Sequence, residues 1–160
     1  MASNPFTTCL WFDGEAEAAA DYYLSVFKDG RRGRVGLYPE GGPGVAGEVM
    51  VVEFEINGQR FVGLNGGPQF PFTEAVSFQI HCADDAEADY YYEALTGDGG
   101  EESACGWVKD KFGLSWQVIP AGAIELISDP DPGRAARATA AMMKMKKLDV
   151  AEMRRAADAG

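Results

Sequence analysis

The sequence predicts an α+β protein in which one order of elements occurs twice and is followed by C-terminal helices. Three observations predict this class. A strand-like segment, a helix-like segment and further strand-like segments follow one another, and the order recurs after roughly seventy residues. The two helix-like segments share a short motif, AEAAADYY and AEADYYY. Beyond residue 120 the pattern is helical only.

The first half reads as a strand at 7–12 and a helix at 15–27, where the large apolar residues recur at helical spacing. Three further strands are expected at 33–38, 47–56 and 59–65. Asn57-Gly58 separates the last two, and both residue types tolerate positive φ. These two strands therefore form a hairpin with a two-residue turn.

The second half repeats the order with a strand at 75–82, a helix at 84–95 and strands at 104–110 and 112–120. Matching the two halves makes Thr8 equivalent to Ser77 and Glu53 equivalent to Gln117. We expect a single domain over 1–160, built from two modules at about 5–70 and 74–120 with a helical extension at about 121–158.

The extension holds a short helix at 121–128 and two longer helices at 133–147 and 150–157. Asp131 and Asp149 are suited to cap the longer helices, and Pro132 fits a first helical position. One stripe of the first long helix carries Ala135, Ala138, Met142 and Met145. We interpret this stripe as packed core or as a subunit interface.

The formal charge of −11 argues against some classes of partner. A strongly acidic chain repels phosphate backbones and anionic lipids, so we expect no binding to nucleic acid or membranes. No apolar run approaches the length of a membrane span, and MASNPFTT lacks the features of a leader. The predicted location is cytoplasmic.

Period-two alternation divides the strands into an apolar and a polar face. The apolar face is expected under the helices, and it comprises Val52, Phe54, Ile56, Val76, Phe78, Ile80, Leu114, Trp116 and Val118. The polar face is expected to comprise Thr8, Glu53, Glu55, Ser77, Gln79, His81, Ser115 and Gln117. The polar set either faces water or, if the two halves curve toward each other, lines a cleft.

Four segments resemble the PhnB-like branch of the vicinal-oxygen-chelate superfamily, the glyoxalase/bleomycin-resistance/dioxygenase fold. They are CLWFDGEAEAAADYYLSVF, FVGLNGGPQFPFTEAVSFQIHC, CGWVKDKFGLSWQVIP and DPDPGRAARATAAMMKMKKLDV. The resemblance covers nearly the whole chain. It implies paired βαβββ modules whose eight strands form a curved cup, commonly within a homodimer.

Metal enzymes of this superfamily take His or Glu ligands from four strand positions, which the resemblance places at Thr8, Glu53, Ser77 and Gln117. Only Glu53 is a strong ligand, so we expect neither a bound metal nor another cofactor. If a strand is shifted by one or two residues, Glu55 would join Glu53 and His81 would enter the cup. That alternative gives two carboxylates and one histidine, a set that iron enzymes use.

Two functions follow from this interpretation. The first is a binding protein for an unidentified small organic molecule, in which polar groups fix the ligand and aromatic side chains wall the cup. The polar groups are Thr8, Glu53, Ser77, Gln79 and Gln117, and the walls are Phe6, Tyr38, Phe70, Phe72 and Trp107.

The second function is a metal-independent enzyme of the isomerase or lyase type. If aromatic side chains exclude water from Glu53, its carboxylate could abstract a proton as a general base. A plainer alternative is that Glu53 is solvated or paired with an arginine.

The same branch often carries the name 3-demethylubiquinone-9 3-methyltransferase. A methyl donor bound in the usual way needs a glycine-rich turn from a strand into a helix. The two glycine-rich stretches, EGGPG at 40–44 and NGGP at 65–68, are expected to run into strands or loops. We therefore do not expect methyl transfer.

Overall fold

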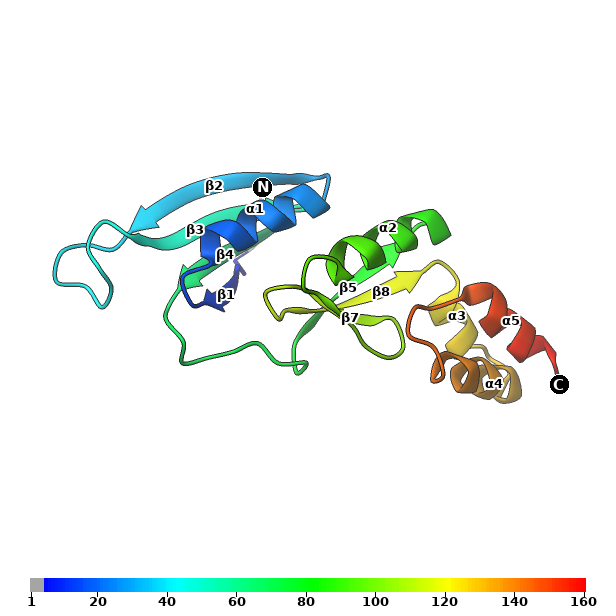
Figure 1. Cartoon of the computed structure of the whole chain (residues 1–160). Helices are drawn as coiled ribbons and strands as arrows, with labels where there is room; N and C mark the ends of the chain where they lie inside the picture. Colours follow the sequence, from blue (N-terminus) through cyan, green and yellow to red (C-terminus); the bar gives the residue numbers. More distant parts are fainter. Residues whose placement is uncertain (1–4) are drawn as a thin grey trace. The chain divides into compact units, whose positions relative to one another are not determined.

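A computed structural model describes residues 5–160, and the chain divides into two compact units, Met1–Pro71 and Phe72–Gly160 (Figure 1). The described part of each unit contains one open four-stranded sheet and one helix packed on it. Three further helices follow in the second unit. The α+β class predicted from the sequence is confirmed, and the boundary between the units falls between the two predicted modules.

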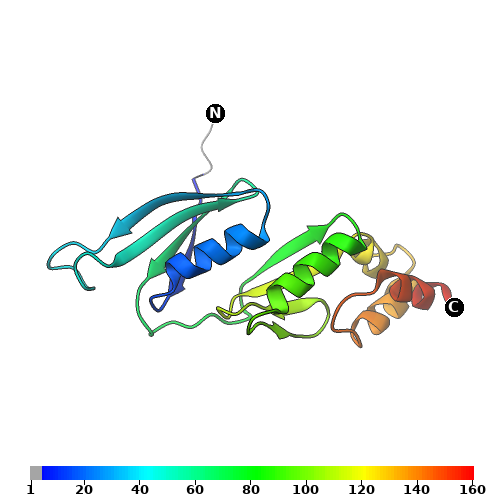
Figure 2. The ribbon, with the colours of Figure 1, turned by 45° about the horizontal axis from the view of Figure 1, so that its top comes forward.

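The first unit has the order β-α-β-β-β. Its elements are β1 (Thr8–Phe12), α1 (Ala16–Val26), β2 (Gly30–Leu37), β3 (Val49–Ile56) and β4 (Gln59–Asn65). The strands lie in the order β1-β4-β3-β2, with β1 parallel to β4 and the other pairs antiparallel. Figure 2 shows α1 lying along one face of this sheet, which leaves the opposite face open within the unit.

Alternation along β3 explains why α1 covers this face. Val52, Phe54 and Ile56 are buried, while Glu53 and Glu55 between them are only partly buried. The Phe54 ring stacks on Phe61 of β4, with centroids 5.2 Å apart. The predicted hairpin turn is confirmed, because Asn57 and Gly58 have φ of 49° and 76°.

The second unit repeats the order. Its elements are β5 (Ser77–Cys82), α2 (Asp85–Thr96), β6 (Glu101–Glu102), β7 (Trp107–Lys109) and β8 (Ser115–Pro120), followed by α3 (Ala123–Ile127), α4 (Pro132–Met142) and α5 (Val150–Asp158). The strand order is β5-β8-β7-β6, with β5 parallel to β8. The two sheets therefore have the same topology, as a βαβββ repeat requires.

Three local expectations differ from the structure. β6 was not expected, because two residues are too few to show alternation. β2 begins earlier than expected and contains an irregularity between Arg32 and Val35. Val76 is 63% exposed although it was placed on the apolar face, because β5 begins only at Ser77.

The helix expected at 133–147 ends at Met142. The chain then turns, and the carbonyls of Met145 and Lys146 accept hydrogen bonds from the backbone of Cys105 and Gly106, at 2.8 and 2.6 Å. The amides of Lys144 and Met145 donate to the carbonyls of Ala141 and Met142, three positions back, so the chain leaves the α-helical pattern after Met142. The hydrogen bonds from Cys105 and Gly106 then hold the following turn against the loop before β7.

The stripe of α4 packs within the chain. Ala138 is fully buried, and Met142 and Met145 lie against a cluster that includes Ile119, Leu126 and Met153. The interpretation as packed core is supported, so the stripe gives no separate argument for a subunit interface. Asp131 and Asp149 cap α4 and α5 as expected.

Among the described helices, none combines the length and apolar character that crossing a bilayer requires. The joining of the two sheets into one eight-stranded cup stays a prediction, as does the single domain.

Candidate functional site

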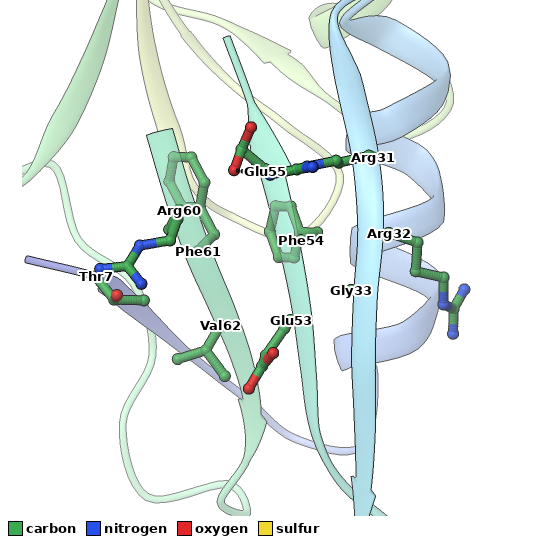
Figure 3. Close-up of a pocket in the computed structure, with 10 residues that line it drawn as sticks. All are labelled: Thr7, Arg31, Arg32, Gly33, Glu53, Phe54, Glu55, Arg60, Phe61 and Val62. Atoms are coloured by element: carbon green, nitrogen blue, oxygen red, sulfur yellow. Dashed lines mark hydrogen bonds and ion pairs between the residues drawn. The ribbon is translucent and has the colours of Figure 1, made fainter. Parts of the chain in front are cut away.

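The open face of the first sheet carries alternating charges. Arg31 of β2, Glu55 of β3 and Arg60 of β4 are cross-strand neighbours, so their side chains lie in one row. Glu55 accepts a hydrogen bond from Arg31 at 2.9 Å. These residues line a cavity of about 510 Å³ together with Thr7, Glu53 and Val62. In Figure 3, Arg32 points toward α1 instead, where it pairs with Glu17 and Asp21.

Glu53 has an arginine partner on this face. Arg34 lies 3.1 Å from its carboxylate, and the Glu53 side chain is 46% exposed. A general base of the expected kind would be shielded from water and free of a cation. The geometry therefore agrees with the plainer alternative, an arginine-paired carboxylate.

Thr8 does not share a face with Glu53, so this part of the prediction is wrong. Its cross-strand neighbour is Phe61, which is buried on the side of α1. Thr8 alternates in step with Leu10 and Phe12, both buried. Thr7 lines the cavity in its place. The apolar period set by Leu10 and Phe12 is the sequence signal that would have revealed this orientation.

Three predicted polar residues come together on the open face of the second sheet. The Gln117 amide donates to the Ser77 hydroxyl at 2.9 Å, and the Gln79 amide donates to the Gln117 carbonyl at 3.3 Å. All three belong to the paired strands β5 and β8. We call Ser77, Gln79 and Gln117 the amide row. It is uncharged and its members hold one another in place.

Trp107 is the cross-strand neighbour of Gln117 on the same face. The other two tryptophans are engaged structurally. The Trp11 indole N–H donates to the Gly67 carbonyl and that of Trp116 to the buried Asp110, both at 2.8 Å. Within residues 5–160, the indole N–H of the partly buried Trp107 has no such acceptor. It is therefore available to a ligand.

The structure adds charged residues to this face that the sequence interpretation missed, namely Lys109, Glu74 and Glu101, the cross-strand neighbour of Lys109. Lys109 follows Trp107 at a spacing of two, and its ammonium lies 2.6 Å from Glu74. The hydrogen bond from Lys109 lowers the pKa of Glu74, and the same bond raises the pKa of Lys109. The alternation of Trp107 and Lys109 along β7 was the available signal.

The aromatic residues predicted as walls have different surroundings. Phe70 packs edge-on against Trp11 in the first unit, with centroids 4.8 Å apart. Phe72 is partly buried in the second unit. Phe6 is 80% exposed, and the Tyr38 hydroxyl donates to the Asn65 carbonyl. Only Trp107 lies beside the amide row in the strand register.

The predicted equivalence of Glu53 and Gln117 is wrong. The shared topology makes β3 correspond to β7 and β4 to β8. One row of the first sheet reads Cys9, Val62 and Glu53, and the matching row of the second reads Gln79, Gln117 and Trp107. Val62 therefore occupies the position of Gln117. The two residues of β6 show no alternation in the sequence, so the second half lacks one strand when the halves are matched by sequence pattern.

The sequence predicts that no metal binds at the four strand positions, and it leaves a shifted set with Glu53, Glu55 and His81 as the alternative. Within the part of the chain that the structure describes, no three His, Cys, Asp or Glu side chains come together in a way that could hold an ion. His81 is exposed on β5, and Glu55 is paired with Arg31. The absence of a bound metal stays a prediction.

Desolvation affects two of the three thiols, the buried Cys82 and, to a smaller extent, the exposed Cys9. Desolvation raises the pKa of Cys82 to about 11, and it also raises the pKa of Cys9. A raised pKa leaves these thiols protonated near neutral pH. Neither therefore resembles an activated nucleophile.

The sequence profile of the 3-demethylubiquinone-9 3-methyltransferase family matches residues 4–119. The chain belongs to this family. The family is the PhnB-like branch of the vicinal-oxygen-chelate superfamily, so the resemblance seen in the sequence is confirmed. A comparison with curated proteins gives no match.

Solved structures agree with this PhnB-like membership. A PhnB protein from Bacillus cereus is 32% identical, with a TM-score of 0.64 over 71% of this chain and 97% of that chain. Protein PA1353 from Pseudomonas aeruginosa is 19% identical, with a TM-score of 0.56 over 71% and 95%. The fosfomycin resistance protein FosX from Mesorhizobium loti is 14% identical, with a TM-score of 0.53 over 76% and 94%. The last two show the shared fold alone.

The family description names a methyltransferase. The positions of the two glycine-rich stretches show whether the chain has the usual turn for binding a methyl donor. Residues 40–44 lie in the loop between β2 and β3, and residues 65–68 begin at the last residue of β4 and run into the loop after it. Neither stretch leads from a strand into a helix, as the sequence predicted. These loops do not form the glycine-rich turn that dinucleotide and related cofactor sites use.

Proposed function

We propose that this protein binds a small, uncharged organic molecule on the open face of the second sheet. The observation that carries the proposal is the Trp107 indole beside the amide row, an indole whose N–H has no acceptor among the described residues 5–160. Small-molecule sites combine apolar or aromatic surface with a few placed polar groups. An indole next to two carboxamides and a hydroxyl supplies that combination.

The chemistry of this face favours a neutral ligand with a flat ring and acceptor oxygens. The Trp107 N–H is a donor, the Ser77 hydroxyl retains its own hydrogen, and Gln117 retains one amide hydrogen. A carbonyl or ether oxygen matches these donors, and a ring can stack on the indole. Lys109, the cation on this face of the second sheet, is already paired with Glu74. This pairing argues against an anionic ligand.

The alternative of an isomerase or lyase with Glu53 as base has no observation in its favour. Its carboxylate is paired with Arg34 and nearly half exposed. The binding function therefore takes precedence over the enzymatic one.

A fragment screen by saturation-transfer NMR tests the proposal. The probes are a panel of neutral heteroaromatic amides and ketones, with aromatic carboxylates as a comparison set. We expect hits among the neutral set, lost in Trp107→Ala and Gln117→Leu. Gln59→Leu is the matched control, because Gln59 lies on β4 of the other unit and donates to Thr8. Hits that persist in both site variants would contradict the proposal.

Stability measurements separate a binding role of Trp107 from a structural one. Trp107→Ala should cost about 1 kcal/mol or less of unfolding free energy. Trp116→Ala should cost about 3–5 kcal/mol, because this ring is buried and bonded to Asp110. Urea unfolding gives both values. If the Trp107 variant loses as much as the Trp116 variant, Trp107 belongs to the core.

A further inference from the structure

We propose that Cys105 and Met143 form a binding site for a soft monovalent cation, Cu(I). The Cys105 Sγ lies 3.7 Å from the Met143 Sδ, although 38 positions separate the two residues in the chain. Thiolate and thioether sulfur are the donors that select Cu(I). This site is separate from the amide row, and its argument does not depend on the proposed function.

The three methionines at the end of α4 and in the following turn have different roles. Met142 and Met145 pack against the core cluster of the C-terminal helices, and the Met145 sulfur accepts a hydrogen bond from the Asp149 amide. Met143 is 63% exposed and directs its sulfur to Cys105. Its thioether therefore contributes little to the core and is accessible to an ion.

Cys105 is fixed by its backbone rather than by its side chain. Its φ is 58°, in the left-handed region that residues other than glycine seldom adopt. The hydrogen bonds from Cys105 and Gly106 to Met145 and Lys146 hold this conformation, and they join the loop before β7 to the turn after α4 (Figure 1). Glycine or asparagine would adopt this φ at lower cost. The fold thus holds a thiol against Met143 in a costly conformation.

The distance between the sulfurs suits a shared ion. If each metal–sulfur bond is about 2.3 Å, the length found for metal thiolates, two sulfurs 3.7 Å apart subtend an angle of about 107° at the metal. This value is close to the tetrahedral angle, so both sulfurs can bind without moving. Water or an external thiol would complete the coordination.

The charges of the ligands favour a monovalent ion. Binding releases the Cys105 proton to solvent, and one thiolate with one cation of charge +1 gives a neutral centre without any redox step. Zn(II) sites instead collect several thiolates, imidazoles or carboxylates, and a thioether supplies none of that charge. The pair should therefore discriminate against Zn(II).

Competition with bicinchoninate under anaerobic conditions tests the proposal, with Cu(I) itself as the probe. The experiment uses the full chain carrying Cys9→Ser, because Cys9 is an exposed thiol that would add background, whereas Cys82 is buried. We expect this chain to retain about one Cu(I) and no Zn(II), and the additional change Cys105→Ser to abolish retention. No retention by the starting chain, or equal retention of Zn(II), would overturn the proposal.

The contribution of Met143 needs its own test, because a single thiol can also hold Cu(I). Met143→Leu should weaken Cu(I) binding by about tenfold or more. It should also reduce the sulfur shell seen by X-ray absorption from two atoms to one. Met142→Leu is the matched control and should leave both readouts unchanged. If Met143→Leu changes neither the affinity nor the sulfur shell, the pair is not a site.

Discussion

Gln117 shows how a single residue type determines what a sheet face can bind. Its amide nitrogen donates to Ser77 and its carbonyl accepts from Gln79, so its polar atoms face partners of complementary character. A glutamate at position 117 would still accept a hydrogen bond from Gln79, but it would place a negative charge at a partly buried position. The amide keeps the row neutral, which suits an uncharged ligand and does not suit a divalent ion.

We therefore predict that the wild-type chain binds no Ni, Co, Zn, Mn or Fe(II) stoichiometrically at these positions. Neutral hydroxyl and amide groups do not offset the loss of the hydration shell of a divalent cation. The single carboxylate of the predicted set, Glu53, is already paired with Arg34. Elemental analysis after dialysis against each metal should find well under one ion per chain.

A gain-of-function variant provides the control for this prediction. Ser77→His, Gln79→His and Gln117→Glu together replace the amide row with three strong ligands at positions that are already within hydrogen-bond distance. This variant should bind Zn(II), measured by competition with a chromophoric chelator. A wild-type chain that retains one ion and loses it in Glu53→Ala would show that the interpretation of these residues is wrong.

At the scale of the element, periodicity together with cap residues, turn residues and the repeat order predicted the described elements longer than two residues. Apolar residues at helical or strand spacing mark an element because they must be buried on one side, as Val52, Phe54 and Ile56 of β3 are. β6 was not predicted, because Glu101 and Glu102 are held by pairing to β7 and have no apolar face that a sequence pattern could show. The end of α4 was not predicted, because the turn after it accepts hydrogen bonds from Cys105 and Gly106, which are distant in the sequence.

The candidate site was predicted less completely than the fold, for related physical reasons. Gln79, Gln117 and Ser77 were found because their strands alternate clearly, and the structure places them in contact. The partners Arg34 and Glu74 come from other segments, so sequence spacing carries no information on them. Thr8 was misplaced because it was matched to the polar Ser77 of the repeat, against the alternation that Leu10 and Phe12 set along β1.

The β7–β8 hairpin provides a prediction at this scale. Asp110 is 3% exposed, and its carboxylate accepts hydrogen bonds from the backbone of Phe112 and Leu114 and from the Trp116 indole, at 2.9, 3.1 and 2.8 Å. Asp110→Asn turns one acceptor oxygen into a donor that faces another N–H. It should therefore cost about 1–3 kcal/mol of unfolding free energy.

The matched control for this substitution is Asp98→Asn. Asp98 forms a surface ion pair with Lys111 of the same hairpin, 2.7 Å apart, and its side chain is 82% exposed. Exposed pairs contribute little because water screens them. The urea midpoint should fall for Asp110→Asn and stay within error for Asp98→Asn. Equal midpoints for the two variants would show that the buried carboxylate does not hold the hairpin.

At the scale of the whole molecule, the two units have the same sheet topology but differ in net charge and in the elements that follow their sheets. The second unit alone has the three C-terminal helices, whose core includes Ile119 of β8. The full chain has a net charge of −11. Any association between copies must therefore overcome electrostatic repulsion, and this repulsion is screened by salt.

We predict that the protein is a homodimer whose stability increases with ionic strength. The expectation comes from the PhnB-like family, and the salt dependence comes from the charge, because a dimer carries twice the −11 of one chain. Light scattering on a size-exclusion column should give about twice the chain mass of 17.2 kDa at tens of micromolar protein. Sedimentation at low and high NaCl should show a dissociation constant that falls as salt rises, because the Debye length shrinks to about 3 Å at 1 M salt. A mass of one chain at both salt concentrations would contradict the dimer. A dimer that dissociates as salt is added would instead show that attractive ion pairs between copies outweigh the repulsion of their net charges.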